Sequence, residues 1–295
     1  MIGITVRAML VSLLLGTSLT PVGEAAETRN ARAEWWWDDA WWDNGTLTQD
    51  QNHEVEVRWT SYKNGDTEVP AMIARPKKPG KYPGILFQHG RRGLDDLIKL
   101  KVRRLAARGF VVLAPDVYAA NFMEPFPYAH DYKLEGDVEK GVDALMKLPD
   151  ISNSKTCLVS HTRGGYYTLK VAVTKKRQLK DVVCYVSWYP HMQDPNAPEP
   201  SQVYGYAPEA DDLKIPSLIF IGENEQYQRR RAIESAVSSM KKLGRDATLI
   251  IYPGVGRGFD FRPENVRTFA DDLASKDANQ RAAQFLRKHL KPYIK

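Results

Sequence analysis

The chain has 295 residues, of which 43% are hydrophobic and 26% are charged, an ordinary globular composition. This length allows a single α/β domain of about 250 residues with one core. The formal net charge of +6 is spread along the chain and accompanies no nucleic-acid-binding motif. The composition therefore argues against a nucleic-acid partner.

The first 25 residues predict a secretory signal peptide. Arg7 precedes an apolar run over residues 8–19, and small residues stand at Gly23 and Ala25. This order of features is typical of a signal peptide that is cleaved after Ala25. The run is shorter than the ~20 residues that a membrane span needs, and we expect no other transmembrane segment. We therefore expect an exported protein, periplasmic or secreted.

Residues 26–53 form a polar lead-in that contains five of the seven tryptophans, all between Trp35 and Trp42. Five exposed indoles would create a large apolar patch. Three interpretations are open. The indoles fold back onto the domain, they bind a protein partner, or they lie at a membrane surface.

Residues 54–295 predict one domain of alternating strands and helices. Asn64-Gly65 indicates a hairpin turn between the first two strands. Apolar runs predict strands at 54–62, 68–76, 84–88, 110–114, 156–160, 181–188, 216–221 and 247–252. Helical periodicity is found at 95–108, 134–148, 164–175, 229–243 and 279–290.

This alternation predicts an α/β fold with a mostly parallel sheet, helices on both faces and an N-terminal antiparallel hairpin. An initial hairpin followed by strand–helix units is the layout of an α/β-hydrolase. In such a sheet, functional side chains gather at the carboxyl ends of the strands.

Four stretches at these strand ends carry a family resemblance. They are QHGRRG (88–93), APDVYA (114–119), SHTRGG (160–165) and YPGVGRGF (252–259). From about Val55 to His289 the chain resembles the dienelactone hydrolase family. The resemblance implies a nucleophile elbow at 160–165, the sharp strand-to-helix turn that carries the nucleophile, and a catalytic triad.

Each triad position departs from the family pattern. The Cys or Ser nucleophile becomes Thr162, the His becomes Arg257, and the acid becomes Glu225. A guanidinium stays protonated and cannot accept a proton from Thr162. Glu225 and Arg257 are instead expected to form a salt bridge, with bidentate geometry available to them.

Another histidine could act as the base for Thr162. His89 follows the third strand and either reaches Thr162 or only holds the backbone of an oxyanion loop. His161 precedes Thr162, and neighbours at an elbow usually point apart. His191 follows the sixth predicted strand and could line the pocket mouth, while Tyr118 lies in the motif after the fourth.

Arginines are concentrated at the same strand ends. Arg91, Arg92, Arg163 and Arg257 surround an expected oxyanion hole formed by the amides of Arg163 and the Gly90–Arg91 region. Guanidinium groups near a helix N-terminus suit a small carboxylate or phosphate. The alternative is that the first three side chains point into solvent.

Three functions remain open from the sequence. The favoured one is a non-catalytic or repurposed hydrolase-fold domain that binds a small anion or a protein partner. The others are an ester or lactone hydrolase using Thr162 with His89, and a conventional esterase with a different triad. We expect no metal and no cofactor, and we expect Cys157 and Cys184 to be buried free thiols.

Overall fold

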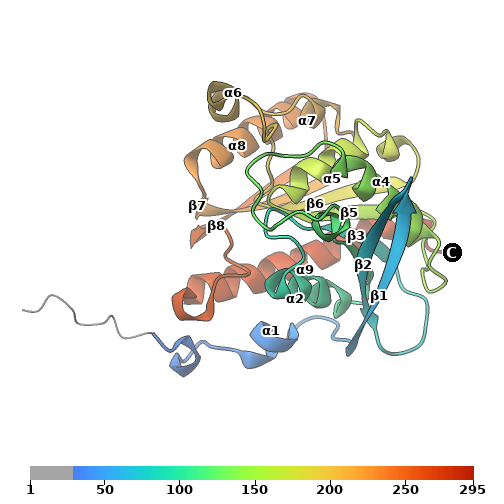
Figure 1. The fold of residues 1–295 in the computed structure, drawn as a ribbon. Coiled ribbons are helices and arrows are strands. Elements are labelled where there is room, and N and C mark those ends of the chain that lie inside the picture. The colour runs from blue at the N-terminus through green and yellow to red at the C-terminus, as the bar shows by residue number, and fades with distance from the viewer. Residues whose placement is uncertain (1–28) are drawn as a thin grey trace, which may run out of the picture.

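A computed structural model describes residues 29–295 and shows one eight-stranded sheet (Figure 1). The predicted signal peptide, residues 1–25, lies outside the described residues. The strand order is β1-β2-β4-β3-β5-β6-β7-β8. The strands are β1 Val55–Asn64, β2 Thr67–Pro76, β3 Gly84–Gln88, β4 Val111–Pro115, β5 Thr156–His161, β6 Val182–Trp188, β7 Ser217–Asn224 and β8 Ala247–Gly256. The hairpin β1–β2 is antiparallel and β2 pairs antiparallel with β4, while β4 to β8 run parallel.

Helices cover both faces of the sheet, as expected for an α/β-hydrolase fold. The α-helices are α1 Asp39–Asn44, α2 Asp96–Ala106, α3 Val117–Ala120, α4 Leu134–Met146, α5 Gly164–Ala172, α6 Glu199–Tyr204, α7 Glu209–Asp212, α8 Tyr227–Lys242 and α9 Phe269–Leu290. In Figure 1, α2 and α9 lie on one face, and α4, α5 and α8 lie on the other. The predicted fold class is therefore confirmed.

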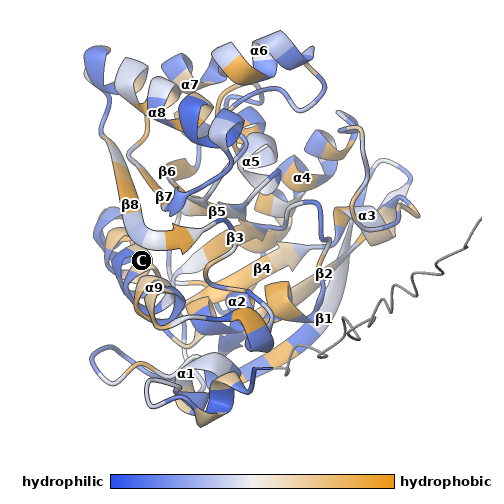
Figure 2. Cartoon of the chain, turned by 90° about the vertical axis from the view of Figure 1, so that its left-hand side faces the viewer, coloured by the Kyte–Doolittle hydropathy of each residue, from blue (hydrophilic) through white to orange (hydrophobic). Residues whose placement is uncertain are grey.

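The central strands are apolar because both of their faces are covered. Every residue of β3, β4 and β5 is buried. Figure 2 shows hydrophobic residues concentrated along β3 and β4, while the outer helices also carry hydrophilic residues. Continuous apolar strands are typical of parallel sheets packed between two helical layers.

The C-terminal helix is longer than predicted. It begins at Phe269, ten residues before the predicted start at Asn279. A capping box explains the earlier start, because Thr268 and Asp271 each accept a hydrogen bond from the other's backbone amide. The first turns of this helix are rich in polar residues, so they lack the apolar periodicity from which a helix is predicted. The short helices α3, α6 and α7 were also not predicted.

The prediction that Cys157 and Cys184 are free thiols is wrong. The two residues are directly opposite each other on β5 and β6, with Cα atoms 4.6 Å apart, and they form a disulfide. A register irregularity between Thr156 and Cys157 lies at the bridge. This Cα separation falls within the range of disulfides, so neighbouring strands do accommodate the bond here.

The tryptophan lead-in packs against the domain. Trp36, Trp41 and Trp42 are buried, whereas Trp35 is 81% exposed. The Trp41 indole donates to the Ser275 hydroxyl at 2.9 Å, which attaches α1 to α9. The first of the three interpretations, intramolecular burial, therefore describes most of this segment. None of the helices between residues 29 and 295 is long and apolar enough to cross a membrane.

Candidate functional site

The elbow predicted at Thr162 is present between β5 and α5. Thr162 has a backbone φ of 49°, a left-handed conformation that a β-branched residue rarely adopts. A Cβ on Gly164 would lie 2.4 Å from the Gln88 carbonyl oxygen, and one on Gly165 would lie 2.3 Å from the Pro190 Cβ. Both glycines are therefore required by close backbone approach, and the strained turn of a nucleophile elbow is retained.

Glu225 and Arg257 form the expected ion pair. The Nη1 atom of Arg257 lies 3.0 Å from the Oε1 atom of Glu225, whose side chain is fully buried. The contact is a single hydrogen bond rather than the bidentate pair considered from the sequence. The two positions of the family's acid and base thus hold a salt bridge, which has no proton acceptor for Thr162.

His89 supports the oxyanion loop rather than Thr162. Its Nδ1 lies 2.8 Å from the Gly90 carbonyl oxygen, and its ring packs edge-on against Tyr118 at 4.8 Å. No hydrogen bond joins His89 to Thr162 within the part of the chain that the structure describes. Burial lowers the pKa of the imidazole. The interpretation in which His89 holds the backbone therefore fits the geometry. Tyr118, a candidate binding residue, is buried against His89 and does not line the cavity at Thr162.

His161 does not belong to the site, in contrast to its inclusion among the candidate binding residues. Its Nε2 lies 3.4 Å from Asp260, and its ring packs against Phe87 and Trp188 in the core. Successive residues of a strand point to opposite faces, which places His161 on the side away from Ser160 and α5. Burial lowers its pKa to about 4, so the ring is neutral at pH 7.

A cavity of about 420 Å³ opens at the elbow. Its lining residues are Arg91, Arg92, Phe126, Thr162, Arg163, His191, Gln226, Arg229, Arg257, Gly258 and Phe261. The four predicted arginines are all included, together with a fifth, Arg229. Gly90 packs directly against the site, because a Cβ there would lie 1.5 Å from the Thr162 hydroxyl oxygen.

Three of the five arginines of this cavity have no carboxylate partner between residues 29 and 295. Arg92 pairs with Asp95 at 2.6 Å, and Arg257 pairs with Glu225. Arg91 and Arg163 donate instead to backbone carbonyls of residues 126–129, which carry no net charge. The Nη1 atom of Arg229 is buried and has no hydrogen-bond partner among the residues that the structure describes.

The electrostatics follow from this arrangement. Burial and the neighbouring Arg257 guanidinium lower the pKa of Arg229 to about 10, so that Arg229 stays charged at pH 7. Burial and the guanidinium of Arg229 hold the pKa of His191 well below its usual range. His191 is therefore neutral, and its buried Nδ1 has no hydrogen-bond partner within the described part of the chain. The cavity combines unneutralised cations with a free imidazole nitrogen, a set that fits an anion.

Arg229 was missed from the sequence because it does not follow a strand. It lies in the first turn of α8, within the run Arg229-Arg230-Arg231. Arg230 pairs with Glu234 at the surface, and Arg231 donates to the Tyr227 hydroxyl. The signal in the sequence that could have identified Arg229 is this basic run, which begins four residues after Glu225.

Comparison with known proteins agrees with the fold. A protein of Yersinia pestis named "Putative carboxymethylenebutenolidase" is 25% identical over 241 residues, covering 75% of this chain and 86% of that protein. Among solved structures, a dienelactone-hydrolase-like promiscuous phosphotriesterase from metagenomic libraries has a TM-score of 0.59 at 17% identity, covering 80% of this chain and 98% of that one.

A bacterial brefeldin A esterase has a TM-score of 0.63 at 16% identity, covering 86% of this chain and 83% of that one. These two structures establish the likeness of the fold alone. The model of the dienelactone hydrolase family matches residues 69–290, which include Thr162, Glu225 and Arg257. The chain therefore belongs to the dienelactone hydrolase family.

Proposed function

We propose that this protein is an exported, repurposed member of its family that binds a small anion at the elbow instead of hydrolysing an ester. The observation that carries the proposal is the ion pair of Glu225 with Arg257 at the triad positions. The pair replaces a proton relay with a salt bridge whose guanidinium cannot accept a proton from Thr162, while the cavity beside it stays open.

The cavity supports anion binding in two further ways. Among the described residues, the lining has five arginines and no carboxylate. The backbone amides of Arg91 and Arg163 also have no hydrogen-bond acceptor among residues 29–295, and Arg163 directly precedes α5. Free amides at a helix N-terminus and unpaired guanidinium groups both favour a carboxylate or a phosphate.

Export is supported by the disulfide. Disulfides persist in oxidising compartments and are rare in the cytosol. The buried Cys157–Cys184 bond thus agrees with the signal peptide expected at residues 1–25. A protein partner at the tryptophan lead-in has less support, because Trp36, Trp41 and Trp42 are buried against the domain.

The alternative, an unconventional ester or lactone hydrolase, requires a base for Thr162. The Nδ1 atom of His89 is bonded to the Gly90 carbonyl, and its Nε2 atom has no hydrogen-bond partner within residues 29–295. The imidazole that lines the cavity with Thr162 is that of His191. Neutral His191 could accept a proton, although its amide, not its ring, contacts Thr162 in the described structure. If the protein is a hydrolase of this kind, its activity should depend on Thr162 and on one of these two histidines.

An activity screen with short acyl esters and lactones tests the proposal, using wild type, Thr162→Ala, His89→Ala and His191→Ala. We expect no turnover above that of Thr162→Ala. Turnover that is lost in Thr162→Ala and in either histidine variant would establish the hydrolase alternative. In parallel, acetate, benzoate and phosphate at millimolar concentration should raise the melting temperature, and a complete lack of stabilisation would count against the anion site.

A further inference from the structure

A second hollow adjoins the elbow cavity. It has a volume of about 430 Å³ and shares Gln226 and Arg229 with the elbow cavity. Its other lining residues are Tyr128, Ala197, Pro198, Glu199, Gln202, Val203 and Gln228. Because both hollows meet at the first turn of α8, a ligand held by Arg229 can extend from one into the other.

The two hollows differ in charge. The elbow cavity is lined by five arginines, whereas the second hollow has Arg229 at the junction and one carboxylate, Glu199. The backbone amide of Gln226 donates to Glu225, but the side-chain amides of Gln226 and Gln228 make no hydrogen bond to residues 29–295. Each side-chain amide therefore offers an NH₂ group as donor and a carbonyl oxygen as acceptor. The part of a ligand in this hollow should therefore be uncharged and rich in hydrogen-bonding groups.

Tyr128 adds an aromatic surface to this hollow. Its side chain is 95% exposed although it lines the hollow. An aromatic ring with a phenol offers an apolar face together with a polar edge. A sugar ring has the matching surfaces, because its C–H groups form an apolar face and its hydroxyls lie around the edge.

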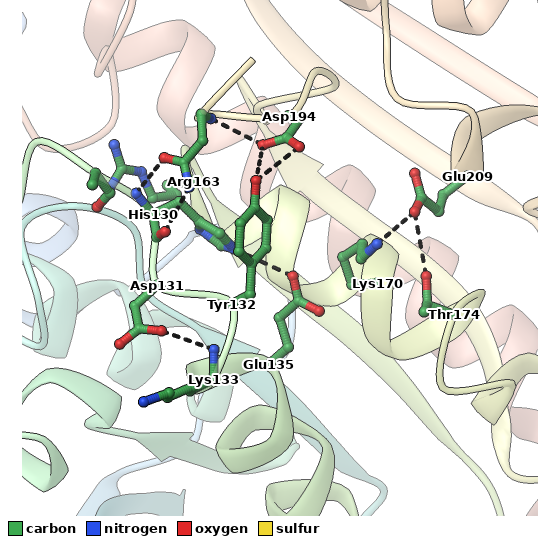
Figure 3. Close-up of polar contacts among 12 residues, drawn as sticks. His130, Asp131, Tyr132, Lys133, Glu135, Arg163, Lys170, Thr174, Asp194 and Glu209 are labelled. Atoms are coloured by element: carbon green, nitrogen blue, oxygen red, sulfur yellow. Dashed lines mark hydrogen bonds and ion pairs between the residues drawn. The ribbon is translucent and has the colours of Figure 1, made fainter.

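The loops that frame the hollow are fixed by polar contacts. The Tyr132 hydroxyl donates to both carboxylate oxygens of Asp194 at 2.9 Å (Figure 3). Arg163 donates to the carbonyls of residues 127–129. The backbone of His130 also exchanges two hydrogen bonds with the Asn196 side chain. Tyr128 is thus held by a braced loop, and a prearranged surface lowers the entropy lost on binding.

We propose that the ligand is an anionic monosaccharide, a sugar acid or sugar phosphate. Its anionic group lies against Arg229 in the elbow cavity, and its sugar ring lies on Tyr128 beside Gln226 and Gln228. The inference rests on the proposed function, since it requires the anion site. It adds that the second hollow recognises an uncharged, hydroxyl-rich group.

Titration calorimetry with matched ligands tests this inference: glucuronate against acetate, glucose 6-phosphate against phosphate, and glucose alone. At least one sugar anion should bind tenfold or more tightly than its small counterpart, and glucose should bind weakly. Binding of glucuronate alone would identify a carboxylate as the anion, and binding of glucose 6-phosphate alone would identify a phosphate.

Variants separate the two hollows. Tyr128→Ala and Gln228→Ala should remove most of the advantage of the sugar anion while leaving acetate and phosphate binding unchanged. Phe122→Ala is the matched control, because Phe122 is 97% exposed in the same loop and lines neither hollow. Small anions that bind as well as the sugar anions would overturn the inference and leave the proposed function standing. An absence of binding by every anion would overturn both.

Discussion

At the scale of single residues, one ion pair changes the chemistry of this site. Arg257 occupies the position at which the family resemblance implies a histidine, and it is neutralised by the buried Glu225. The glycines and the left-handed Thr162 keep the geometry of the elbow. The site therefore has the backbone shape of a nucleophile elbow, and the triad positions beside it hold a salt bridge, which supports the proposed anion site.

Replacing Glu225 with Gln should strengthen anion binding. The substitution removes the carboxylate that neutralises Arg257 and so adds one positive charge beside the cavity. At the effective dielectric of a partly buried site, this charge should tighten phosphate binding by about three- to tenfold. Calorimetry of Glu225→Gln measures the change. Glu234→Gln is the control, because Glu234 pairs with Arg230 on the surface of α8, and equal affinities in both variants would contradict the account.

At the scale of elements, the lead-in is connected to the loop that carries Arg257. The guanidinium carbon of Arg104, on α2, lies 4.4 Å from the ring centroid of Trp41 and 5.1 Å from that of Trp42. The same guanidinium donates to the backbone carbonyls of Trp42 and Asp260. Lys101, one turn away on α2, pairs with the Asp260 carboxylate. The tryptophan segment thus buries the side of α2 that holds the loop after β8.

Trp42→Ala should destabilise the whole domain. Trp42 is 1% exposed, and truncating a buried tryptophan costs about 3–5 kcal/mol of unfolding free energy. Trp35→Ala is the matched control, because Trp35 is 81% exposed and its loss should change stability by about 0.5 kcal/mol or less. Urea denaturation measures both variants. A small effect of Trp42→Ala would mean that the lead-in is not part of the cooperative fold.

Removing the disulfide should also lower stability. The bond joins residues 27 apart, and the loop-entropy estimate for such a loop is about 3.5 kcal/mol. Both cysteines are fully buried, so dithiothreitol should not reduce the disulfide of the folded protein. In urea, unfolding exposes the bond to the reductant, and the urea midpoint should therefore be lower with dithiothreitol than without it. The measurement is urea denaturation with and without reductant, with the Cys157→Ala, Cys184→Ala double variant for comparison. Identical midpoints in all three experiments would contradict this role.

Some of these elements could be predicted from the sequence and others could not. The predicted strands and the Glu225–Arg257 pair were confirmed, because strand periodicity and family motifs are local signals. The start of α9 was missed, since its first turns are polar and depend on the Thr268 cap. The Cys157–Cys184 bond was missed because it depends on the register of two paired strands. Arg229 was missed because it lies in the first turn of α8 and not at the end of a strand.

At the scale of the whole molecule, buried neutral histidines make stability depend on pH. Burial lowers the pKa of His161 to about 4, and those of His89 and His191 are also lowered. An unfolded histidine binds a proton near pH 6.5. Between pH 6.5 and 4 the unfolded chain therefore binds more protons than the folded one.

Stability should accordingly be highest above about pH 7 and fall as the pH is lowered to 4. The shift of His161 alone corresponds to about 3 kcal/mol over this window. Urea denaturation at a series of pH values measures the slope, and His161→Gln should reduce it. A stability that stays flat or rises as the pH falls from 6.5 to 4 would contradict the assignment of His161 as buried and neutral.

The most direct test of the central claim is the affinity of inorganic phosphate and benzoate for wild type, Arg229→Gln and Arg231→Gln, measured by calorimetry. Arg229 lines the cavity with an unpartnered Nη1, whereas Arg231, two residues on, does not line it. We predict saturable binding of at least one of the two anions to wild type and Arg231→Gln, and binding at least tenfold weaker to Arg229→Gln. Equal affinity in all three proteins, or no binding to wild type, would contradict an anion site at the elbow.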